Sequence, residues 1–199
     1  MHCDWCHNPE SLDGSPEVAI TGEKCASCGA CVVACPETDG DRPARGPDWD
    51  EGTCRRCGAC AEVCPSGARE LIGEPRAVAD LVAEIERDRP FFESSGGGVT
   101  FSGGEPLCHP TFLADCLEAC REKGLHTAVD TSGFASRRVI CDIARLTDVL
   151  LYDLKHMDPE THERHTGVDN RRILGNLQTL SEEGAEIWIR FPLIPGFND

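Results

Sequence analysis

The sequence predicts an α/β protein built on a parallel β-sheet, with a small cysteine-rich module inserted near its start. In the second half of the chain, short apolar segments alternate with segments of helical periodicity. Strands separated by helices pair in parallel through right-handed crossovers, which predicts the sheet. Most of the 14 cysteines, in contrast, lie at short regular spacings before residue 65. Such spacing in a chain without a secretory signal favours metal ligation over disulfides.

Composition limits the classes of protein to consider. The chain has 199 residues, is 40% hydrophobic and carries a net charge of −16, as is typical of globular rather than disordered proteins. The excess of acidic residues argues against nucleic acids and anionic membranes as partners. The sequence has neither the roughly 18 to 20 consecutive apolar residues of a membrane span nor an apolar signal segment near Met1, so we expect a cytoplasmic protein.

The expected elements follow one another from residue 75 to the end of the chain. Apolar residues at helical spacing predict a helix that begins after Pro75 and ends at Pro90. The next expected elements are a strand at 99–101, a helix at 110–123, a strand at 125–130, a helix at 136–146, a strand at 148–153, one or two helices within 159–183 and a strand at 185–191. Four such strands form a (β/α) barrel or an open sheet, and both bind ligands at the carboxyl ends of their strands.

Candidate functional residues stand where each expected strand ends. Glycines there allow a ligand to approach the backbone, and charged side chains supply fixed charge. Taken singly, each of these residues is more often a turn glycine or a capping carboxylate than a ligand contact. The candidates are Ser102, Gly103, Gly104 and Glu105 after the first strand, Asp130, Thr131, Ser132 and Gly133 after the second, Asp153 and Lys155 after the third, and Arg190 within the fourth.

Two cysteine runs form an internal repeat, and each reads C-x2-C-x2-C-x3-C-P. This pattern is typical of bacterial ferredoxins with two 4Fe–4S clusters, in which the fourth cysteine of each run ligates the other cluster. The expected ligands are Cys25, Cys28, Cys31 and Cys64 for auxiliary cluster I, and Cys35, Cys54, Cys57 and Cys60 for auxiliary cluster II. A pair of zinc knuckles is the alternative, although zinc sites normally pair two C-x2-C hooks. Residues 40–53 are expected to form a loop between the runs.

The other cysteines and histidines give weaker signals. Cys3 and Cys6 share a C-x2-C spacing, which presents two thiolates to a metal without completing a site. Cys108, Cys116, Cys120 and Cys141 lack ligand spacing and are expected to be buried free thiols. His156, His162 and His165 lie on an acidic segment, where a solvated helix is expected rather than a metal site. The Arg171–Arg172 pair is expected to be a surface feature, with docking of a partner as the alternative.

Together these pieces resemble the radical S-adenosylmethionine (SAM) superfamily, and more narrowly the activating enzymes of glycyl radical enzymes. The matching motifs run in the family's order along the whole chain. They are CDWCHNPE from Cys3 to Glu10, GGVTFSGGEP from Gly97 to Pro106, DTSG from Asp130 to Gly133, YDLK from Tyr152 to Lys155, HTG from His165 to Gly167 and WIR from Trp188 to Arg190. The resemblance implies that residues 1–20 begin a partial (β/α)6 barrel, residues 21–71 form a ferredoxin-like insert with two clusters, and residues 72–199 continue the barrel.

The resemblance also implies an activity. An electron entering a catalytic 4Fe–4S cluster would cleave SAM to methionine and a 5′-deoxyadenosyl radical, which abstracts hydrogen from a glycine of a partner glycyl radical enzyme. A low-potential flavodoxin or ferredoxin would donate the electron, and the auxiliary clusters would relay it or serve a structural role.

The family's functional residues carry over position by position. Cys3 and Cys6 would ligate the catalytic cluster, Trp5 and His7 would flank the adenine, and Ser102, Gly103, Gly104 and Glu105 would receive the methionyl amino group. Asp130, Ser132, Asp153, Lys155 and Arg190 would surround SAM, with Lys155 also catalytic, and Asp130, Thr131 and Asp153 would hold a monovalent cation.

Two departures from the family pattern accompany these matches. The first cysteine of the family's C-x3-C-x2-C pattern would precede Met1, and the last barrel strand would follow Asp199. We therefore expect a fragment or a misplaced start that holds its catalytic cluster poorly. A ferredoxin-type electron carrier and a radical SAM enzyme acting on a small molecule are the alternative functions. Activases of choline, hydroxyphenylacetate, glycerol, arylsuccinate or sulfonate lyases would all fit the sequence.

Overall fold

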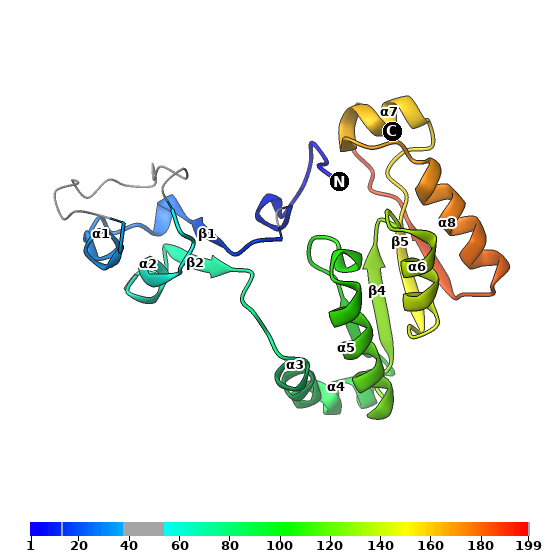
Figure 1. Cartoon of the computed structure of the whole chain (residues 1–199), viewed down its shortest axis with the longest axis horizontal. Coiled ribbons are helices and arrows are strands. Elements are labelled where there is room, and N and C mark those ends of the chain that lie inside the picture. Colours follow the sequence, from blue (N-terminus) through cyan, green and yellow to red (C-terminus); the bar gives the residue numbers. More distant parts are fainter. Residues whose placement is uncertain (13, 38–53, 199) are drawn as a thin grey trace. The chain divides into compact units, whose positions relative to one another are not determined.

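A computed structural model describes residues 1–12, 14–37 and 54–198. The chain divides into two compact units (Figure 1). Unit 1 consists of Met1–Leu12 together with Arg76–Asp199, and unit 2 is Asp13–Pro75.

Unit 1 is built on a four-stranded parallel sheet. Its strands are β3 (Val99–Phe101), β4 (Thr127–Thr131), β5 (Val149–Asp153) and β6 (Ile187–Arg190), hydrogen-bonded in that order. Every neighbouring pair is parallel. The α/β class and the four expected strands are therefore confirmed, with boundaries that differ by one or two residues, as strand ends usually do.

Helices precede the first strand and connect the others. They are α3 (Val78–Ile85), the 3-10 turn η4 (Glu86–Asp88) and α4 (Arg89–Ser95) before β3, the 3-10 turn η5 (Pro106–Cys108) and α5 (Pro110–Glu122) before β4, α6 (Arg137–Ala144) before β5, and α7 (Pro159–Thr166) and α8 (Arg171–Glu182) before β6. The prediction that Pro90 ends a helix is wrong. Pro90 lies in the first turn of α4, where its missing N–H costs no hydrogen bond. None of the described helices has the length and apolar content needed to cross a bilayer.

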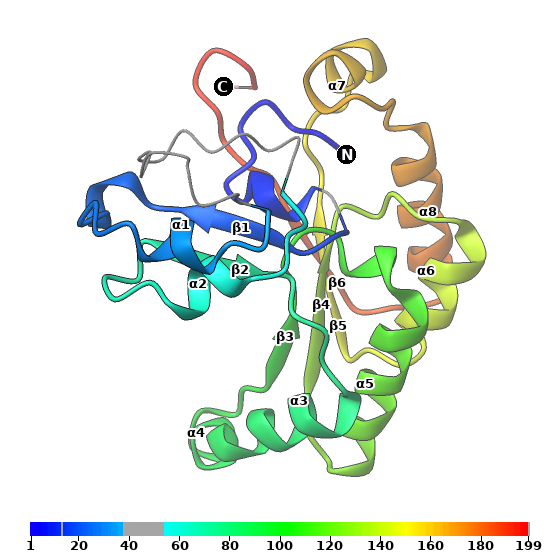
Figure 2. The same ribbon diagram turned by 60° about the vertical axis from the view of Figure 1, so that its left-hand side comes forward.

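Helices α5, α6 and α8 lie along one face of the sheet (Figure 2). Leu117 of α5, Ile140 of α6 and Ile173 of α8 are almost fully buried there. They belong to one hydrophobic cluster with Val129 of β4 and Leu150 of β5. Burial of such side chains stabilises the unit by roughly 1.5 to 3 kcal/mol each, so this helix-covered face is the core.

The opposite face of the sheet carries polar side chains at its carboxyl end. Asp130 pairs with Leu151, which lies two residues before Asp153, and Asp153 pairs with Arg190. Paired residues on neighbouring strands share a face, and so do residues two apart on one strand. The register therefore brings Asp130, Asp153 and Arg190 together on the face away from α5, α6 and α8.

The glycine turn after β4 is locked into the core. Gly133 has a φ of +71°, and a Cβ atom there would lie 1.9 Å from Oη of Tyr152. That hydroxyl donates to the carbonyl oxygen of Ile173 at 2.7 Å, while Nδ2 of the buried Asn176 donates to the carbonyl oxygen of Gly133 at 2.9 Å. The DTSG segment thus requires glycine for both its backbone conformation and its packing.

In unit 2, each of the two cysteine runs is accompanied by one strand and one short helix. Strand β1 (Glu17–Ile20) precedes the first run, β2 (Arg69–Ile72) follows the second, and the two strands pair antiparallel. Each run contains one short helix, α1 (Ala30–Ala34) or α2 (Ala59–Glu62), and these two helices contact each other. The loop expected at 40–53 lies outside the described residues.

Substitution of Gly133 should destabilise unit 1 strongly. We expect Gly133→Ala to lower the free energy of unfolding by roughly 3 kcal/mol or more, because left-handed strain adds to a clash with a buried ring. Gly124→Ala is the matched control, since Gly124 has a φ of +66° and open space around its Cα, and should cost only about 1 kcal/mol. Thermal unfolding of both variants measures the difference, and equal losses would contradict the proposed packing.

Candidate functional site

Four charged side chains meet at the carboxyl ends of β4, β5 and β6. Arg190 donates from Nη2 to Asp130 Oδ1 at 2.5 Å and from Nε to Asp153 Oδ1 at 2.9 Å. Lys155 Nζ donates to Asp153 Oδ2 at 2.7 Å, and Ser102 Oγ donates to Asp130 Oδ2 at 3.0 Å. Each carboxylate accepts two hydrogen bonds, and two cations balance two anions.

These ion pairs are partly shielded from solvent. The Lys155, Asp153 and Asp130 side chains are 15%, 17% and 18% exposed, whereas Arg190 is 45% exposed. Hydrogen bonding to Asp153 raises the pKa of Arg190 above its usual value. Shielded pairs are screened less by salt than exposed ones. The arrangement can hold a small zwitterionic ligand, with the carboxylates facing an ammonium group and the cations facing a carboxylate.

Glu105 fastens the turn after β3 to the end of β4. Its carboxylate accepts from Thr131 Oγ1 at 2.7 Å, from Ser132 N at 3.0 Å and Oγ at 2.5 Å, and from Leu107 N at 3.2 Å. With these donors in place, Glu105 orients the turn that contains Ser102, Gly103 and Gly104. The Thr131 hydroxyl is directed to Glu105 rather than to Asp130 or Asp153, so a monovalent cation at those three residues stays a prediction.

The loop that carries Cys3 and Cys6 belongs to the same unit as the sheet. Cys6 N donates to the carbonyl oxygen of Cys3 at 3.0 Å, which closes a turn, and both thiols are free and half-buried. Burial raises the pKa of the Cys3 thiol, while the positive charge of Lys155 acts in the opposite direction. Because metals bind the thiolate form, Lys155 favours ligation by Cys3.

Backbone contacts attach this loop at two places. His2 N donates to the carbonyl oxygen of Thr166 at 2.8 Å, and Asp4 N donates to that of His165 at 3.0 Å, so the loop lies against the end of α7. Farther along, a Cβ atom on Gly104 would lie only 2.6 Å from the carbonyl oxygen of Ser11. The segment that follows the cysteine loop therefore packs against the Ser102–Glu105 turn, within unit 1.

Two side-chain contacts of the loop could not be predicted from the sequence. His165 Nδ1 lies 2.8 Å from Asp4 Oδ2, and the Trp5 ring packs against Phe197 with 4.6 Å between centroids. No periodicity or motif spacing links residues so far apart in the chain, so only the tertiary structure reveals these pairs. Of the two residues expected at the adenine, Trp5 has this ring partner and His7 is exposed.

The cysteines outside the predicted ligand sets behave in two ways. Cys116, Cys120 and Cys141 are buried, as expected, and burial raises the pKa of Cys116 to about 11. Such thiols are chemically inert near neutral pH. The expectation that Cys108 is buried is wrong. Cys108 lies at the end of the η5 turn and is exposed, because the preceding residue, Leu107, is the one that packs into the core from this turn.

The expectation of a solvated helix is wrong for His162. Its side chain is 1% exposed, and its Nδ1 lies 2.6 Å from the carbonyl oxygen of Val168. His162 and Thr166 lie one helical turn apart, so both face inward from α7. Among residues 1–12, 14–37 and 54–198, no three His, Cys, Asp or Glu side chains are grouped to hold a metal ion.

The two cysteine loops of unit 2 share one backbone shape. Ser27 and Gly29 have φ angles of +52° and +74°, and the matching Arg56 and Gly58 have +54° and +79°. Alternating conformations of this kind turn successive backbone N–H groups toward a common point, which suits anionic centres such as iron–sulfur clusters. In the second loop Arg56 N donates to the Cys54 sulfur at 3.3 Å.

None of the cysteines among the described residues of unit 2 forms a disulfide. A hydrogen bond from Ser66 lowers the pKa of Cys64 to about 7, while burial raises that of Cys60. Cys28 and Cys57, at the middle of each loop, are exposed. The loops therefore present thiols that are not joined in disulfides around backbone N–H groups, a donor set that fits an iron–sulfur centre.

The fold and the site define a parallel α/β domain in which a two-cysteine loop lies beside a charge-balanced site for a small polar ligand. The sequence model of the radical SAM superfamily matches residues 1–199, and the chain belongs to this superfamily.

Several relatives are similar over the whole chain. The chain is 45% identical to the trans-4-hydroxy-L-proline dehydratase activating enzyme of Clostridioides difficile, and the match covers 100% of this chain and 66% of the relative. It is 42% identical to the choline trimethylamine-lyase activating enzyme of Oleidesulfovibrio alaskensis, covering 100% and 65%. It is 38% identical to the (2S)-3-sulfopropanediol sulfolyase activating enzyme of Bilophila wadsworthia, covering 100% and 68%. The chain thus spans about two thirds of the length of these relatives.

A solved structure also matches in part. A domain of a pyruvate-formate lyase-activating enzyme from Bacteroides vulgatus is 45% identical to this chain, with a TM-score of 0.49 over 51% of this chain and 63% of that one.

Removal of the His165 imidazole should loosen the cysteine loop. We expect His165→Ala to raise amide hydrogen exchange in residues 2–6 about threefold, the loss expected from one partly exposed ion pair. His2→Ala is the matched control, because the His2 side chain is exposed and the substitution keeps the backbone N–H that donates to Thr166. Mass spectrometry of the exchanged peptides measures the effect, with alkylation of Cys3 as a second readout. Unchanged protection in His165→Ala would show that the pair does not hold the loop.

Proposed function

We propose that this chain is the SAM-cleaving part of a glycyl radical enzyme activating enzyme. The observation that carries the proposal is the placement of Cys3 and Cys6 beside the strand-end polar residues of unit 1, through Ser11 against Gly104 and Cys3 within the electrostatic range of Lys155. The three relatives are all activating enzymes. When bound, a 4Fe–4S cluster and SAM supply a one-electron reductive cleavage that gives methionine and a 5′-deoxyadenosyl radical, which takes hydrogen from a glycine of the partner.

The residues of unit 1 fit the two halves of SAM. Asp130, joined by Ser102, offers a carboxylate to the methionyl ammonium group. Arg190 and Lys155 offer cations to the methionyl carboxylate, and their existing ion pairs hold them in position before the ligand arrives. Trp5, packed on Phe197, supplies an apolar surface for the adenine. Cys3 and Cys6 hold the cluster, and the charge of Lys155 favours the thiolate form of Cys3.

The partner is a glycyl radical enzyme, and its substrate class stays open. The relatives are named for a hydroxyproline dehydratase, a choline lyase and a sulfopropanediol sulfolyase, at 45%, 42% and 38% identity. These three sequence identities are too similar to one another to favour one partner enzyme over the others. A low-potential flavodoxin or ferredoxin in the cytoplasm donates the electron.

Unit 2 is a ferredoxin-like insert that holds two auxiliary 4Fe–4S clusters and relays this electron. Its support is the matched shape of the two loops and the antiparallel pairing of β1 with β2 around both cysteine runs. Zinc requires several ligands around one ion, and no such group of three exists among the described residues. A cube instead takes its four thiolates on four different irons, so its ligands are more widely spread.

Iron content tests the role of unit 2. Cys28→Ala should lower bound iron by about four atoms per chain, because a cube held by three thiolates is lost more readily. Cys108→Ala removes an exposed thiol outside both ligand sets and should leave the iron content unchanged. Iron and sulfide analysis of anaerobically purified protein provides the measurement. Retention of all iron in both Cys28→Ala and Cys57→Ala would refute the assignment.

Cleavage of SAM tests the proposed activity. The experiment uses protein loaded with iron and sulfide under anaerobic conditions. Under reducing, anaerobic conditions Cys6→Ala should abolish formation of 5′-deoxyadenosine.

Replacement of Arg190 tests the SAM site itself. Arg190→Lys should weaken SAM binding about tenfold, because one ammonium group cannot reproduce the two directed bonds of the guanidinium to Asp130 and Asp153. Arg87→Lys, far from the site, is the control. Equilibrium dialysis measures binding, and chromatography measures the product. A protein with its full iron content that forms no 5′-deoxyadenosine would contradict the proposal.

A further inference from the structure

Two helices of unit 1 begin with a pair of arginines. Arg137 and Arg138 are the first residues of α6, and Arg171 and Arg172 are the first residues of α8. Neither helix has an acidic residue in its first turn. The helix dipole makes an N-terminus electropositive, so cations are disfavoured there and carboxylates are preferred. Helix stability therefore does not explain these four residues, which we call the arginine rim.

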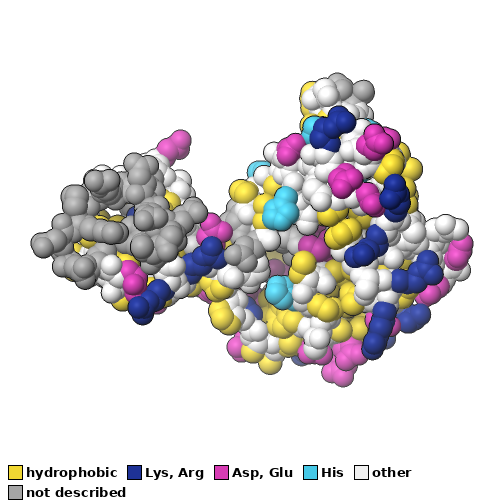
Figure 3. Space-filling model, turned by 45° about the horizontal axis from the view of Figure 1, so that its top comes forward, with side chains coloured by type: hydrophobic (Ala, Val, Ile, Leu, Met, Phe, Trp, Pro, Cys, Tyr) yellow, Lys and Arg dark blue, Asp and Glu magenta, His cyan; other side chains and the backbone are white. Residues whose placement is uncertain are grey.

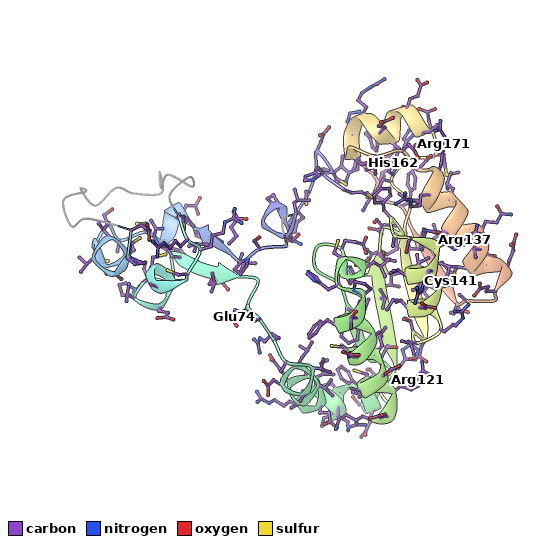
Figure 4. The ribbon with its side chains drawn as sticks, viewed as in Figure 1. Glu74, Arg121, Arg137, Cys141, His162 and Arg171 are labelled. Atoms are coloured by element: carbon purple, nitrogen blue, oxygen red, sulfur yellow. The ribbon has the colours of Figure 1, made fainter. Side chains whose placement is uncertain are left out.

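The two helix N-termini lie next to each other. The Arg172 guanidinium carbon is 5.0 Å from the centre of the Phe134 ring, just before α6 begins. Asn176, in the middle of α8, donates to the carbonyl oxygens of Gly133 and Ala135 at 2.9 and 3.0 Å, which holds α8 against the same segment. In Figure 4, Arg137 and Arg171 are labelled on the helical layer of unit 1. The arginine rim is thus one surface built from two helices.

Little negative charge neutralises this surface. The side chains of Arg138 and Arg171 are 91% and 79% exposed, and they contact Asp142 and Asp169 only at 3.7 and 3.5 Å. For Arg137 and Arg172, no ion pair with a carboxylate occurs within the part of the chain that the structure describes. Lys and Arg side chains gather along the right-hand side of Figure 3. This concentration is notable in a chain with a net charge of −16.

The position of the arginine rim indicates its partner. Helix α6 begins shortly after the carboxyl end of β4, and Arg172 at the start of α8 contacts Phe134 in the segment between β4 and α6, so the arginines lie at the end of the sheet that carries Asp130. If the proposed function holds, a protein that presents a glycine to this site must cover that end of unit 1. An electron donor can instead deliver its electron to the clusters of unit 2.

We propose that the arginine rim docks an acidic surface of the glycyl radical enzyme. The inference rests on the proposed function. Charges at the rim of an interface act mainly on association rate and on the salt dependence of binding, so the rim steers the partner toward the site. The chain's overall negative charge repels an acidic partner elsewhere, which gives the docking its orientation.

The test compares double variants with equal charge change. Arg137→Gln/Arg172→Gln removes one unpaired cation from each helix. Arg87→Gln/Arg121→Gln is the control. Arg121 lies at the opposite end of the helical layer (Figure 4). Arg87 belongs to the same region, because Arg89, two residues after it, donates to the carbonyl oxygen of Lys123, two residues after Arg121. Arg137→Lys/Arg172→Lys keeps the charge and tests for a loss of packing on Phe134.

Binding is measured at low and at high salt to the glycyl radical enzymes for which the relatives are named, beginning with trans-4-hydroxy-L-proline dehydratase. The rim glutamine variant should bind about tenfold more weakly at low salt, with a smaller difference at high salt. The control and the lysine variant should stay within about threefold of the unchanged chain. Equal binding by the rim and control glutamine variants would overturn the proposal.

Two further measurements distinguish docking of the glycyl radical enzyme from a general loss of activity and from docking of the electron donor. Formation of 5′-deoxyadenosine without the partner, driven by dithionite, should be the same in all variants, and its absence from every variant would count against the proposed function instead. If the rim variant binds the glycyl radical enzyme normally but is reduced more slowly by flavodoxin, the arginine rim serves the electron donor and the proposal is wrong.

Discussion

Arg190 donates to carboxylates on two different strands, and this shared guanidinium holds the carboxyl ends of β4, β5 and β6 in one arrangement. Two partly buried carboxylates so close together would repel each other without a cation between them. Lys155 supplies the second positive charge and also favours the thiolate of Cys3. Lys155 therefore links the strand ends electrostatically to the cysteine loop. The candidate site depends on the balance between two carboxylates and two cations.

Other contacts within unit 1 hold the strand ends and the cysteine loop in position. Glu105 ties the turn after β3 to the end of β4 through three hydrogen bonds. Gly133 allows Tyr152 to fill the core directly beneath the DTSG segment. The end of α7 receives the backbone of the cysteine loop. Several residues that resemble ligand contacts in the sequence are thus also positioning residues.

Much of unit 1 could be predicted because its signals are local. Alternation of apolar segments with helical segments predicted the four strands and their parallel order. The wrong predictions arose where tertiary packing overrides local pattern. Pro90 can start a helix as well as end one. His162 is polar, but it is buried with its Nδ1 near the carbonyl oxygen of Val168. Cys108 is apolar in character but exposed, because Leu107 takes the inward position of the same turn. Burial of a single residue depends on neighbours that are distant in sequence.

The sequence by itself determined the α/β class, the repeat of two cysteine runs and the identity of the polar residues at the strand ends, because each depends on spacing along the chain. Only the tertiary structure decided which of those residues contact one another. It showed that Arg190 joins Asp130 to Asp153, that Asp4 meets His165, and that the arginines of α6 and α8 form one surface. Such pairs are fixed by sheet register and helix packing, which no single stretch of sequence encodes.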